Sequence, residues 1–381
     1  MNNRIAKILS VSALALGVAQ AFAADLKIGF ISSLSGPVAA LGIPYEKGIR
    51  AAIAEQPTIG GRKVELIVLD DASDPTTAGR NARKLVVDDK VDVLIGTSGV
   101  PGAMAIAAVA KETGTPLISP TPVVIPGGAD TWTVTVSQPF PLMVAAVVDK
   151  MKKAGVKTVA FIGFSDALGD LAYDSLMKSA ERAGIKVVAN ERYARSDSSV
   201  AGQVLKIVAQ RPDAVFAGNS GTPGALPYLA LAERGYKGQI YGTHGLINAD
   251  FVRVGGAAIN GLQVPSGPVL VADQLPDSNP IKKVSLAFRN SYQKTNGALP
   301  TDAFSSYTYD AYLLLADAAK RTKGEPGTPQ YRTALRDAIV ATHELVGTHG
   351  VYNFKADNRY GSDERAVVIV RMEKGQWKLA Q

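Results

Sequence analysis

Short apolar segments alternate along this chain with longer segments of helical pattern, and this alternation constrains the fold more than any other feature. The apolar segments are rich in Val, Ile and Leu, as is typical of parallel strands that are buried on both faces. They lie at 26–31, 64–69, 91–95, 116–118, 158–162, 186–189, 214–217 and 239–241. This order predicts an α/β fold with right-handed βαβ crossovers.

The segments between these strands predict helices whose ends carry the expected residues. Asp74 is placed to cap a helix that opens at Pro75, where the missing proline N–H needs no partner. Gly184 and Gly235 follow helical segments and are expected to end them. The predicted helices lie near 44–56, 75–89, 102–113, 141–154, 168–183, 198–210 and 222–234.

The middle of the chain repeats the pattern of its beginning. Residues 140–241 restart the helix–strand order, whereas a Pro- and Gly-rich loop at 265–280 opens a different region. That region predicts helices near 281–295, 303–321 and 328–341, and then antiparallel strands at 351–354 and 366–372. We therefore predict two doubly wound lobes, with more than one chain crossing between them. Ligands bind beyond the carboxyl ends of such strands, so a ligand cleft is expected between the lobes.

The N-terminus has the three parts of a secretory signal peptide. Arg4 and Lys7 form a basic start, and residues 8–18 form an apolar stretch too short to span a bilayer. Ala23 completes a small-x-small site, so cleavage is expected before Ala24 and the product is expected in the periplasm. No later apolar run is long enough to insert into a membrane. Residues 24–381 then fit two domains of roughly 100–200 residues each.

The composition argues against several classes of function. The chain has no cysteine, which excludes disulfides, thiolate metal sites and cysteine catalysis. Its formal net charge of +7 comes from scattered basic residues, without the basic and aromatic clusters of a nucleic-acid interface. Its 3 histidines lack metal-ligand spacing. We expect no metal, no cofactor and no nucleic-acid partner.

Motifs for catalysis are also missing from the sequence. There is no GxSxG elbow to supply a hydrolase nucleophile, and no GxGxxG or GxxxxGK[ST] loop for a nucleotide. Asp70 and Asp71 are neighbours on a predicted strand, so their side chains point to opposite faces and do not easily share one site. We therefore expect a binding protein, with an enzyme as the disfavoured alternative.

Three loops that follow strands of the first lobe carry candidate binding groups. The loop at 32–42 is small, polar and longer than a usual βα turn. The loop at 96–102 leads into a helix N-terminus, where free amides favour a carboxylate. The loop at 119–123 follows the next strand. All three are expected to line one cleft.

His244 follows a predicted strand of the second lobe and is the candidate binding residue on that side. A neutral imidazole donates one hydrogen bond and a protonated one adds charge, so it suits an acid or a phenol. A hydrogen-bonded turn histidine is the alternative. His343 and His349 precede a predicted strand, and we expect both to be structural.

Several motifs together resemble the leucine/isoleucine/valine-binding protein family of periplasmic receptors. They are IGFISSLSGP at 28–37, LDDASDP at 69–75, LIG at 94–96, LISP at 117–120 and GVYNF at 350–354. The resemblance covers essentially the whole chain after the signal peptide. It implies a type I periplasmic-binding fold that closes on its ligand by a hinge, and it implies the permease of an ABC importer as partner.

The resemblance also suggests how the chain is divided. The signal peptide is expected at 1–23. The N-terminal lobe is expected at 24–139 plus 269–348, and the C-terminal lobe at 140–268 plus 349–381. We expect a monomer.

Matching to the family changes the expected ligand. Hydroxyl side chains that hold an α-carboxylate in amino-acid-binding members fall at Val100 and Val123 here. The acidic residue that meets the α-ammonium falls at His244, and an imidazole does not replace a carboxylate in that role. These matches argue against an α-amino acid.

The same matching predicts an apolar pocket that would accept an aromatic ring. Pocket tyrosines of amino-acid binders fall at Leu41 and Leu168, which gives a lining suited to an aromatic ring. Segments 164–170 and 218–223 resemble a branch that takes up aromatic acids, including hydroxycinnamates and benzoates. The expected ligand-binding residues are Leu41, Ser98, Gly99, Val100, Gly102, Thr121, Pro122, Val123, Phe164, Leu168, Ser220 and His244.

Two alternatives remain for a binding protein of this type. A branched-chain amino-acid receptor on the same fold needs an acidic group near the ammonium, which Asp166 or Asp170 would have to supply. A ligand-sensing partner of a membrane signalling protein would share the fold but not the permease.

Overall fold

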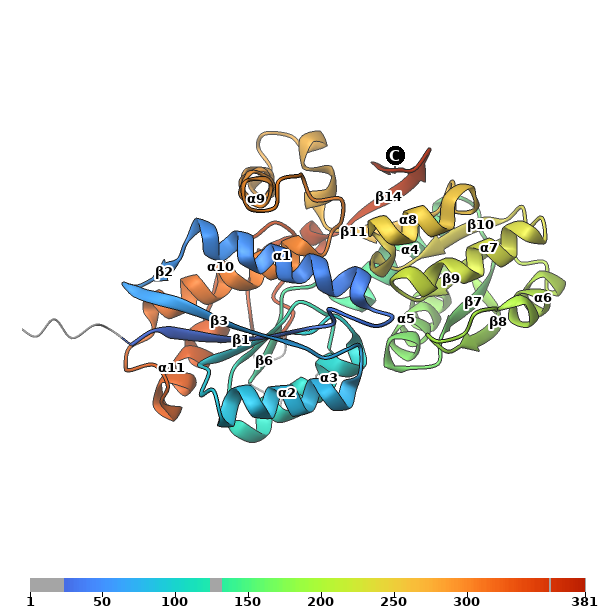
Figure 1. Ribbon diagram of the computed structural model, residues 1–381. Helices are drawn as coiled ribbons and strands as arrows, with labels where there is room; N and C mark the ends of the chain where they lie inside the picture. Colours follow the sequence, from blue (N-terminus) through green and yellow to red (C-terminus); the bar gives the residue numbers. More distant parts are fainter. Residues whose placement is uncertain (1–23, 124–131, 356–357, 381) are drawn as a thin grey trace, which may run out of the picture.

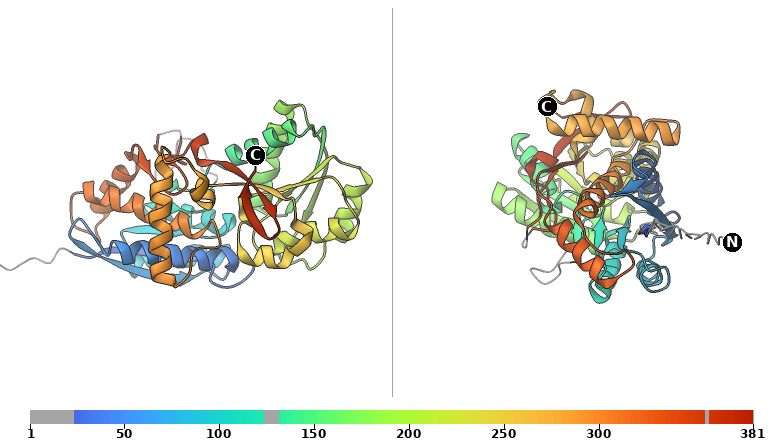
Figure 2. Two further views of the ribbon diagram at one scale, coloured as in Figure 1. Left: turned by 90° about the horizontal axis from the view of Figure 1, so that it is seen from above. Right: turned by 90° about the vertical axis from the view of Figure 1, so that its left-hand side faces the viewer.

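The chain folds into two α/β lobes that lie side by side and form an elongated molecule (Figures 1 and 2). The computed structural model describes residues 24–123, 132–355 and 358–380. The predicted signal peptide therefore lies outside the described residues. Within those residues, no helix is long and apolar enough to cross a membrane.

The first lobe is built on a six-stranded sheet of order β2-β3-β1-β4-β5-β6. All neighbouring strands are parallel except the β2–β3 pair. Its strands are β1 (Leu26–Ser32), β2 (Thr58–Ile59), β3 (Arg62–Asp70), β4 (Val93–Gly96), β5 (Leu117–Ser119) and β6 (Thr133–Thr135). The short central strands β4 and β5 are fully buried, which explains their unbroken apolar sequences.

Helices cover both faces of this first sheet. One core contains residues of α2 (Pro75–Val87) and α3 (Val100–Thr113). The other contains residues of α1, α9, α10 and α11. Their bounds are Ala39–Glu55 for α1, Pro280–Asn296 for α9, Ser305–Arg321 for α10 and Pro329–Val340 for α11. In Figure 1, α1, α9 and α10 lie above the strands of the sheet, whereas α2 and α3 lie below them.

The second lobe has a seven-stranded sheet of order β15-β14-β11-β10-β9-β7-β8 around one core. Its strands are β7 (Thr158–Phe164), β8 (Lys186–Tyr193), β9 (Ala214–Gly218), β10 (Gln239–Gly242), β11 (Gln263–Ser266), β14 (Val368–Glu373) and β15 (Gln376–Leu379). Its helices are α4 (Phe140–Lys153), α5 (Ala167–Ala183), α6 (Ala201–Ala209), α7 (Leu226–Glu233) and α8 (Ala249–Gly255). The antiparallel strands β14 and β15 close one edge of the sheet.

The chain passes between the lobes at a hinge. Gln138 precedes α4 and enters the second lobe, and the 3-10 helix η4 (Pro268–Gln274) follows β11 on the way back. The small hairpin of β12 (Leu345–Val346) and β13 (Val351–Tyr352) ends at Tyr352, and both Tyr352 and the following Phe354 pack in the core of the first lobe. We therefore propose that the third crossing follows Phe354, later than the expected boundary at 348/349; the other boundaries stay predictions.

The α/β fold and the predicted strands are confirmed, and one helix start is wrong. The sequence placed the start of the first helix near Pro44, but α1 begins at Ala39 and carries Pro44 inside it. The loop after β1 therefore covers only residues 33–38, so the expectation of an unusually long loop is wrong. Asp74 caps α2 as predicted, with its Oδ1 accepting a hydrogen bond from Thr77 N at 2.6 Å. Strands β2, β6, β11, β12 and β15 and helix α8 were not predicted.

Candidate ligand-binding site

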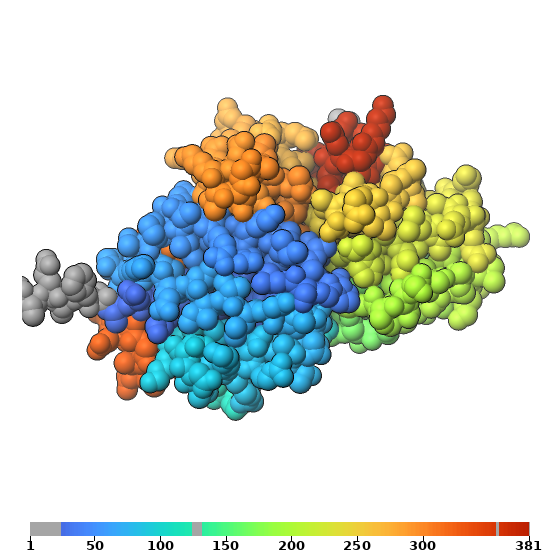
Figure 3. All heavy atoms as spheres, in the orientation of Figure 1, coloured from blue at the N-terminus to red at the C-terminus, as the bar shows by residue number. Residues whose placement is uncertain are grey.

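A small cavity lies between the lobes where strands of both sheets end. The first lobe contributes the start of α1 and the loops after β4 and β5, and the second contributes the turns after β9 and β10 and the start of α5. In the space-filling view the two lobes touch on the face shown (Figure 3). The lining residues are Leu41, Tyr45, Ser98, Gly99, Val100, Thr121, Pro122, Leu168, Ser220, Thr243, His244, Gly245 and Phe304.

Most of the residues predicted for the site line this cavity, and three do not. Those brought together are Leu41, Ser98, Gly99, Val100, Thr121, Pro122, Leu168, Ser220 and His244. Gly102 lies deeper in α3, where an added Cβ would be 2.8 Å from the Thr97 side chain. Val123 packs in the core between α2, α3 and the first sheet. Phe164 packs in the second core against Tyr193, with ring centroids 5.0 Å apart.

Tyr45, Thr243, Gly245 and Phe304 line the cavity without having been predicted. Tyr45 follows Leu41 by one helical turn and so shares its face of α1, but that signal depends on a helix that begins before Leu41. Thr243 and Gly245 flank His244 in the same turn. Phe304 precedes α10, and no local pattern in the sequence links it to the cleft.

The N-terminus of α3 forms the polar part of the first-lobe wall. Its N-cap residue, Gly99, supplies no side-chain hydrogen bond to the first turn. Ser98 Oγ instead accepts a hydrogen bond from Ser33 N at 3.1 Å, and Thr121 Oγ1 donates to Thr97 O at 2.6 Å. The hydroxyls thus hold the loops together. Because Pro101 has no N–H and Ala103 N already donates to Gly99 O, the amide of Val100 is the first-turn donor of α3 that lies in the cavity lining.

A glycine brings α1 close to this wall. A Cβ at Gly42 would lie only 1.9 Å from the carbonyl oxygen of Ser33. Ser32 Oγ in turn donates to Gly42 O at 2.9 Å. This contact sets the first turns of α1, and with them Leu41 and Tyr45, against the loop that carries Ser98.

Arg195 is a charged side chain that contacts the second-lobe wall, and it was not predicted from the sequence. Its Nε donates to Asp166 Oδ2 at 2.6 Å, and its Nη1 donates to the cavity residue Ser220 at 3.2 Å. Its Nη2 is buried without a hydrogen-bond partner among the described residues. The guanidinium lies 4.1 Å above the ring of Phe164, so Phe164 supports Arg195 and does not face the cavity.

His244 is the second polar group of that wall, and it is buried and neutral. Its ring packs edge-on against Phe140 and Tyr307, with centroid distances of 5.9 and 6.3 Å. Desolvation lowers the pKa of His244 to about 4, so the imidazole is uncharged at neutral pH. Its Nδ1 has no hydrogen-bond partner among the described residues, although water does not reach it.

The cavity is narrow and carries no formal charge on its lining. None of its described lining residues is Asp, Glu, Lys or Arg. Its free space is about 20 Å³, enough for about one water molecule, whereas a cavity of about 150 Å³ accommodates benzene. A ring-sized ligand therefore requires the two lobes to separate further than they do in this conformation.

Comparison with known proteins shows which family has this two-lobed architecture. The family model described as "Periplasmic binding protein" matches residues 25–376. The chain therefore belongs to the periplasmic binding protein family, and its fold is the type I fold of that family.

Individual relatives agree with this assignment. The Leu/Ile/Val-binding protein homolog 3 of Brucella melitensis is 27% identical over 343 residues, which cover 87% of this chain and 89% of the relative. An extracellular ligand-binding receptor from Rhodopseudomonas palustris HaA2 is 39% identical with a TM-score of 0.90, covering 94% of this chain and 100% of that chain. The leucine-binding protein LivK of Thermotoga maritima is 25% identical with a TM-score of 0.82, covering 93% and 98%.

Proposed function

We propose that this chain is the periplasmic substrate-binding protein of an ABC importer and that it captures a small aromatic carboxylate without changing it chemically. Membership of the periplasmic binding protein family supports the binding role. The ligand class rests on one observation: an apolar cavity free of acidic side chains lies beside an arginine with an unpartnered, buried Nη2.

An α-amino acid lacks a partner for its ammonium group in this cavity. Asp166 is engaged elsewhere, since its Oδ1 accepts from Leu168 N and Gly169 N while its Oδ2 pairs with Arg195. Asp170 lies outside the cavity lining and pairs with Arg192 at 3.2 Å. A neutral imidazole at His244 does not compensate a buried positive charge.

A carboxylate, in contrast, finds donors on both walls. Gly99 and Val100 line the cavity at the N-terminus of α3, where unpaired amides carry the partial positive charge of a helix N-terminus. On the second-lobe side, Arg195 Nη1 donates a hydrogen bond to Ser220, which lines the cavity. A carboxylate between these donors would gain charge-assisted hydrogen bonds.

The remaining lining is suited to an aromatic ring. Leu41, Val100, Leu168 and Phe304 present apolar surface, and the Tyr45 hydroxyl donates to Pro120 O at 3.0 Å, so its ring is also held in place. Aromatic rings favour such apolar walls with few polar groups. His244 is then placed to donate to, or accept from, a polar substituent of the ring.

Ligand entry and capture would use the hinge. The cavity is too narrow for a ring in this conformation, so the lobes would open to admit the ligand and close around it. Small-angle scattering should show a smaller radius of gyration at saturating ligand than without ligand. An unchanged radius would argue against capture by closure.

Calorimetry and thermal shifts test the ligand class. Benzoate- and cinnamate-type acids should stabilise the protein, by about 2.7 kcal/mol at 100 times the dissociation constant, and leucine should do so little. Arg195→Gln should weaken binding of the acid about tenfold or more, because a charged hydrogen bond is lost. Arg192→Gln is the control, since Arg192 lies near the end of β8, three residues before Arg195, and pairs with Asp170 outside the cavity lining.

A branched-chain amino-acid receptor is the second candidate, because relatives carry the name Leu/Ile/Val-binding protein. Tight leucine binding without any response to aromatic acids would establish that function and overturn the aromatic one.

A further inference from the structure

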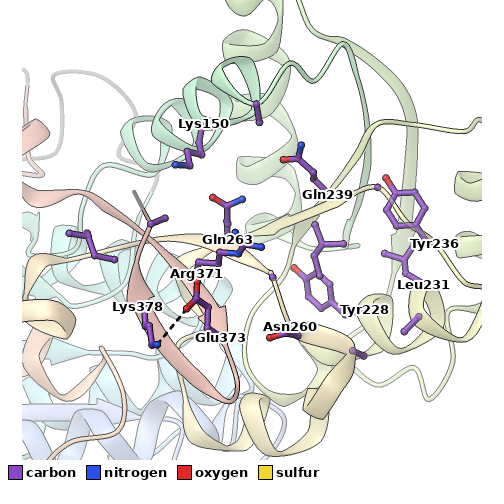
Figure 4. A pocket seen from close by; sticks show the side chains of 18 of the residues that line it. Lys150, Tyr228, Leu231, Tyr236, Gln239, Asn260, Gln263, Arg371, Glu373 and Lys378 are labelled. Carbon is purple, nitrogen blue, oxygen red and sulfur yellow. Dashed lines mark ion pairs between the residues drawn. The ribbon is translucent and has the colours of Figure 1, made fainter.

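A second hollow lies at the end of the second lobe where β10 begins, and Figure 4 shows the side chains that line it. Its volume is about 960 Å³, within the range of ligand pockets. β10 begins there at Gln239 and ends at Gly242, immediately before the cavity residues Thr243 and His244. This hollow, which we call the distal groove, and the cleft thus lie at opposite ends of β10.

A row of polar side chains forms the floor of the distal groove. Gln263 pairs in register with Arg371, and Arg371 pairs with Lys378 on the next strand. Residues directly opposite one another on neighbouring strands present their side chains on the same face. The three side chains therefore line one surface, and Lys150 of α4 overlooks it in Figure 4.

Hydrogen-bond donors outnumber acceptors along this row. Among the described residues, the guanidinium of Arg371 makes no ion pair or hydrogen bond. Gln239 Oε1 accepts from the Tyr241 hydroxyl, which leaves the NH2 group of Gln239 for an outside partner. Glu373 is the single carboxylate among the described lining residues, and Lys378 already pairs with it at 3.5 Å.

An apolar wall faces this row from the side of α7. Tyr228, Leu231 and Tyr236 lie together on that side in Figure 4, with Ile240 and Leu379 also in the lining. The Tyr236 hydroxyl donates to Pro212 O at 3.0 Å, so the phenol is already satisfied inside the protein. Tyr228 and Leu231 are buried, so the accessible apolar surface of this wall comes from the half-buried Tyr236 and Ile240 and the exposed Leu379.

We infer that the distal groove binds a small organic anion, with its anionic oxygens on the Arg371 row and its apolar part on the α7 wall. Arg371 supplies a forked set of N–H donors that suits carboxylate or phosphate oxygens. The amide of Gln239 adds a directional donor at the same surface. Because the groove lies outside the cleft, the inference is independent of the proposed function.

Calorimetry with phenyl phosphate and inorganic phosphate tests this inference, at low ionic strength so that charge is little screened. Phenyl phosphate should bind more tightly than inorganic phosphate, and Arg371→Gln should weaken its binding about tenfold. Lys186→Gln is the matched control, because it removes one positive charge at the other edge of the same sheet and should leave binding unchanged. Arg371 is exposed, so the variant is expected to fold.

Three results would overturn the inference. Equal effects of Arg371→Gln and Lys186→Gln would reduce the binding to long-range charge. Equal affinity for the two phosphates would remove the apolar half of the site. Binding that responds to Arg195→Gln but not to Arg371→Gln would place phenyl phosphate in the cleft.

Discussion

The hinge and the cavity each bury one histidine, and the two are satisfied differently. In the hinge, His349 Nε2 lies 2.6 Å from Ser306 Oγ, its Nδ1 lies 3.3 Å from Gln138 Nε2, and its ring stacks on Tyr307 at a centroid distance of 3.7 Å. In the cavity wall, His244 Nδ1 has no partner among the described residues. Both rings are nearly removed from solvent, so exposure does not explain the difference.

The hinge histidine belongs to a continuous hydrogen-bond network. The Tyr307 hydroxyl donates to Gln138 Oε1, and Gln138 Nε2 donates to Ala366 O at 3.0 Å. These partners come from the first and third crossings and from α10, so one network ties the crossings to the first lobe. The polar groups of this hinge network are thus paired with one another, whereas Nδ1 of His244 in the cavity wall and Nη2 of Arg195 beside it have no partner among the described residues.

The largest effect is expected from removing the hinge histidine. His349→Ala loses two hydrogen-bond partners and a stacked ring in a buried site, which should lower the free energy of unfolding by about 3 kcal/mol. Urea denaturation measures this loss. Affinity for an aromatic acid, measured on the folded fraction, should change little. A large loss of affinity without loss of stability would show that His349 acts on the ligand.

His244→Ala should show the opposite pattern. It removes a polar partner of the ligand from a nearly dry cavity, so affinity for an aromatic acid should weaken by about 1–3 kcal/mol, or roughly 5- to 150-fold. The loss of stability should be smaller than at His349, because Nδ1 of His244 makes no internal hydrogen bond. Unaltered affinity in a folded variant would return His244 to a structural role.

Replacing His244 with a charged residue should increase the effect on ligand binding. His244→Glu should weaken an acid further than the alanine does, because two negative groups would then meet in a low-dielectric site. The same carboxylate would supply the ammonium partner that the cavity lacks, so a weak response to leucine should appear. Calorimetry with both ligands checks the pair of changes, and an acid bound as tightly as by the wild type would contradict this orientation.

The sequence predicted the strand ends around the cavity better than the side chains behind them. Short buried strands have a composition that is visible without a structure, and the loops after them bring Ser98, Thr121 and His244 to one place. Arg195 escaped prediction because it follows an eight-residue strand of mixed polarity, and nothing local marks it as facing Ser220.

The errors have two physical causes, side-chain direction and packing between segments far apart in the sequence. Val123 and Phe164 occupy the loop and strand end expected, but their side chains turn into the cores of the two lobes. Phe304 reaches the cavity only because α10 packs beside α1, a contact between segments far apart in the sequence. Such packing depends on tertiary structure that periodicity does not contain.

The pH dependence of stability should report on both buried histidines. Desolvation lowers the pKa of His349 to about 3 and that of His244 to about 4, against an ordinary 6.5. Below pH 6.5 these histidines become protonated in the unfolded chain but stay neutral in the folded protein. The free energy of unfolding therefore falls as the pH falls.

His244→Gln removes one of these two contributions. The unfolding free energy of the variant relative to wild type should therefore rise as the pH drops from about 6 to 4, by at most about 1.4 kcal/mol per pH unit. Burial raises the pKa of Asp310 to about 6, which acts in the opposite sense, but Asp310 is common to both proteins and cancels in the difference. Parallel stability curves for the two proteins would contradict a buried, neutral His244.

The smallest effect is expected at Asp170, and it bears on which ligand the second-lobe wall accepts. The Asp170 side chain is 70% exposed, pairs with Arg192 and lies outside the cavity lining. An exposed ion pair contributes about 0–1 kcal/mol, so Asp170→Asn should leave both stability and aromatic-acid affinity nearly unchanged. If the chain instead bound leucine with Asp170 as the ammonium partner, the same variant would lose leucine binding strongly. Titration of leucine and of an aromatic acid into Asp170→Asn therefore distinguishes two ligand classes. Unchanged binding of the aromatic acid fits a wall that binds a carboxylate, whereas lost leucine binding fits a wall in which Asp170 binds an ammonium.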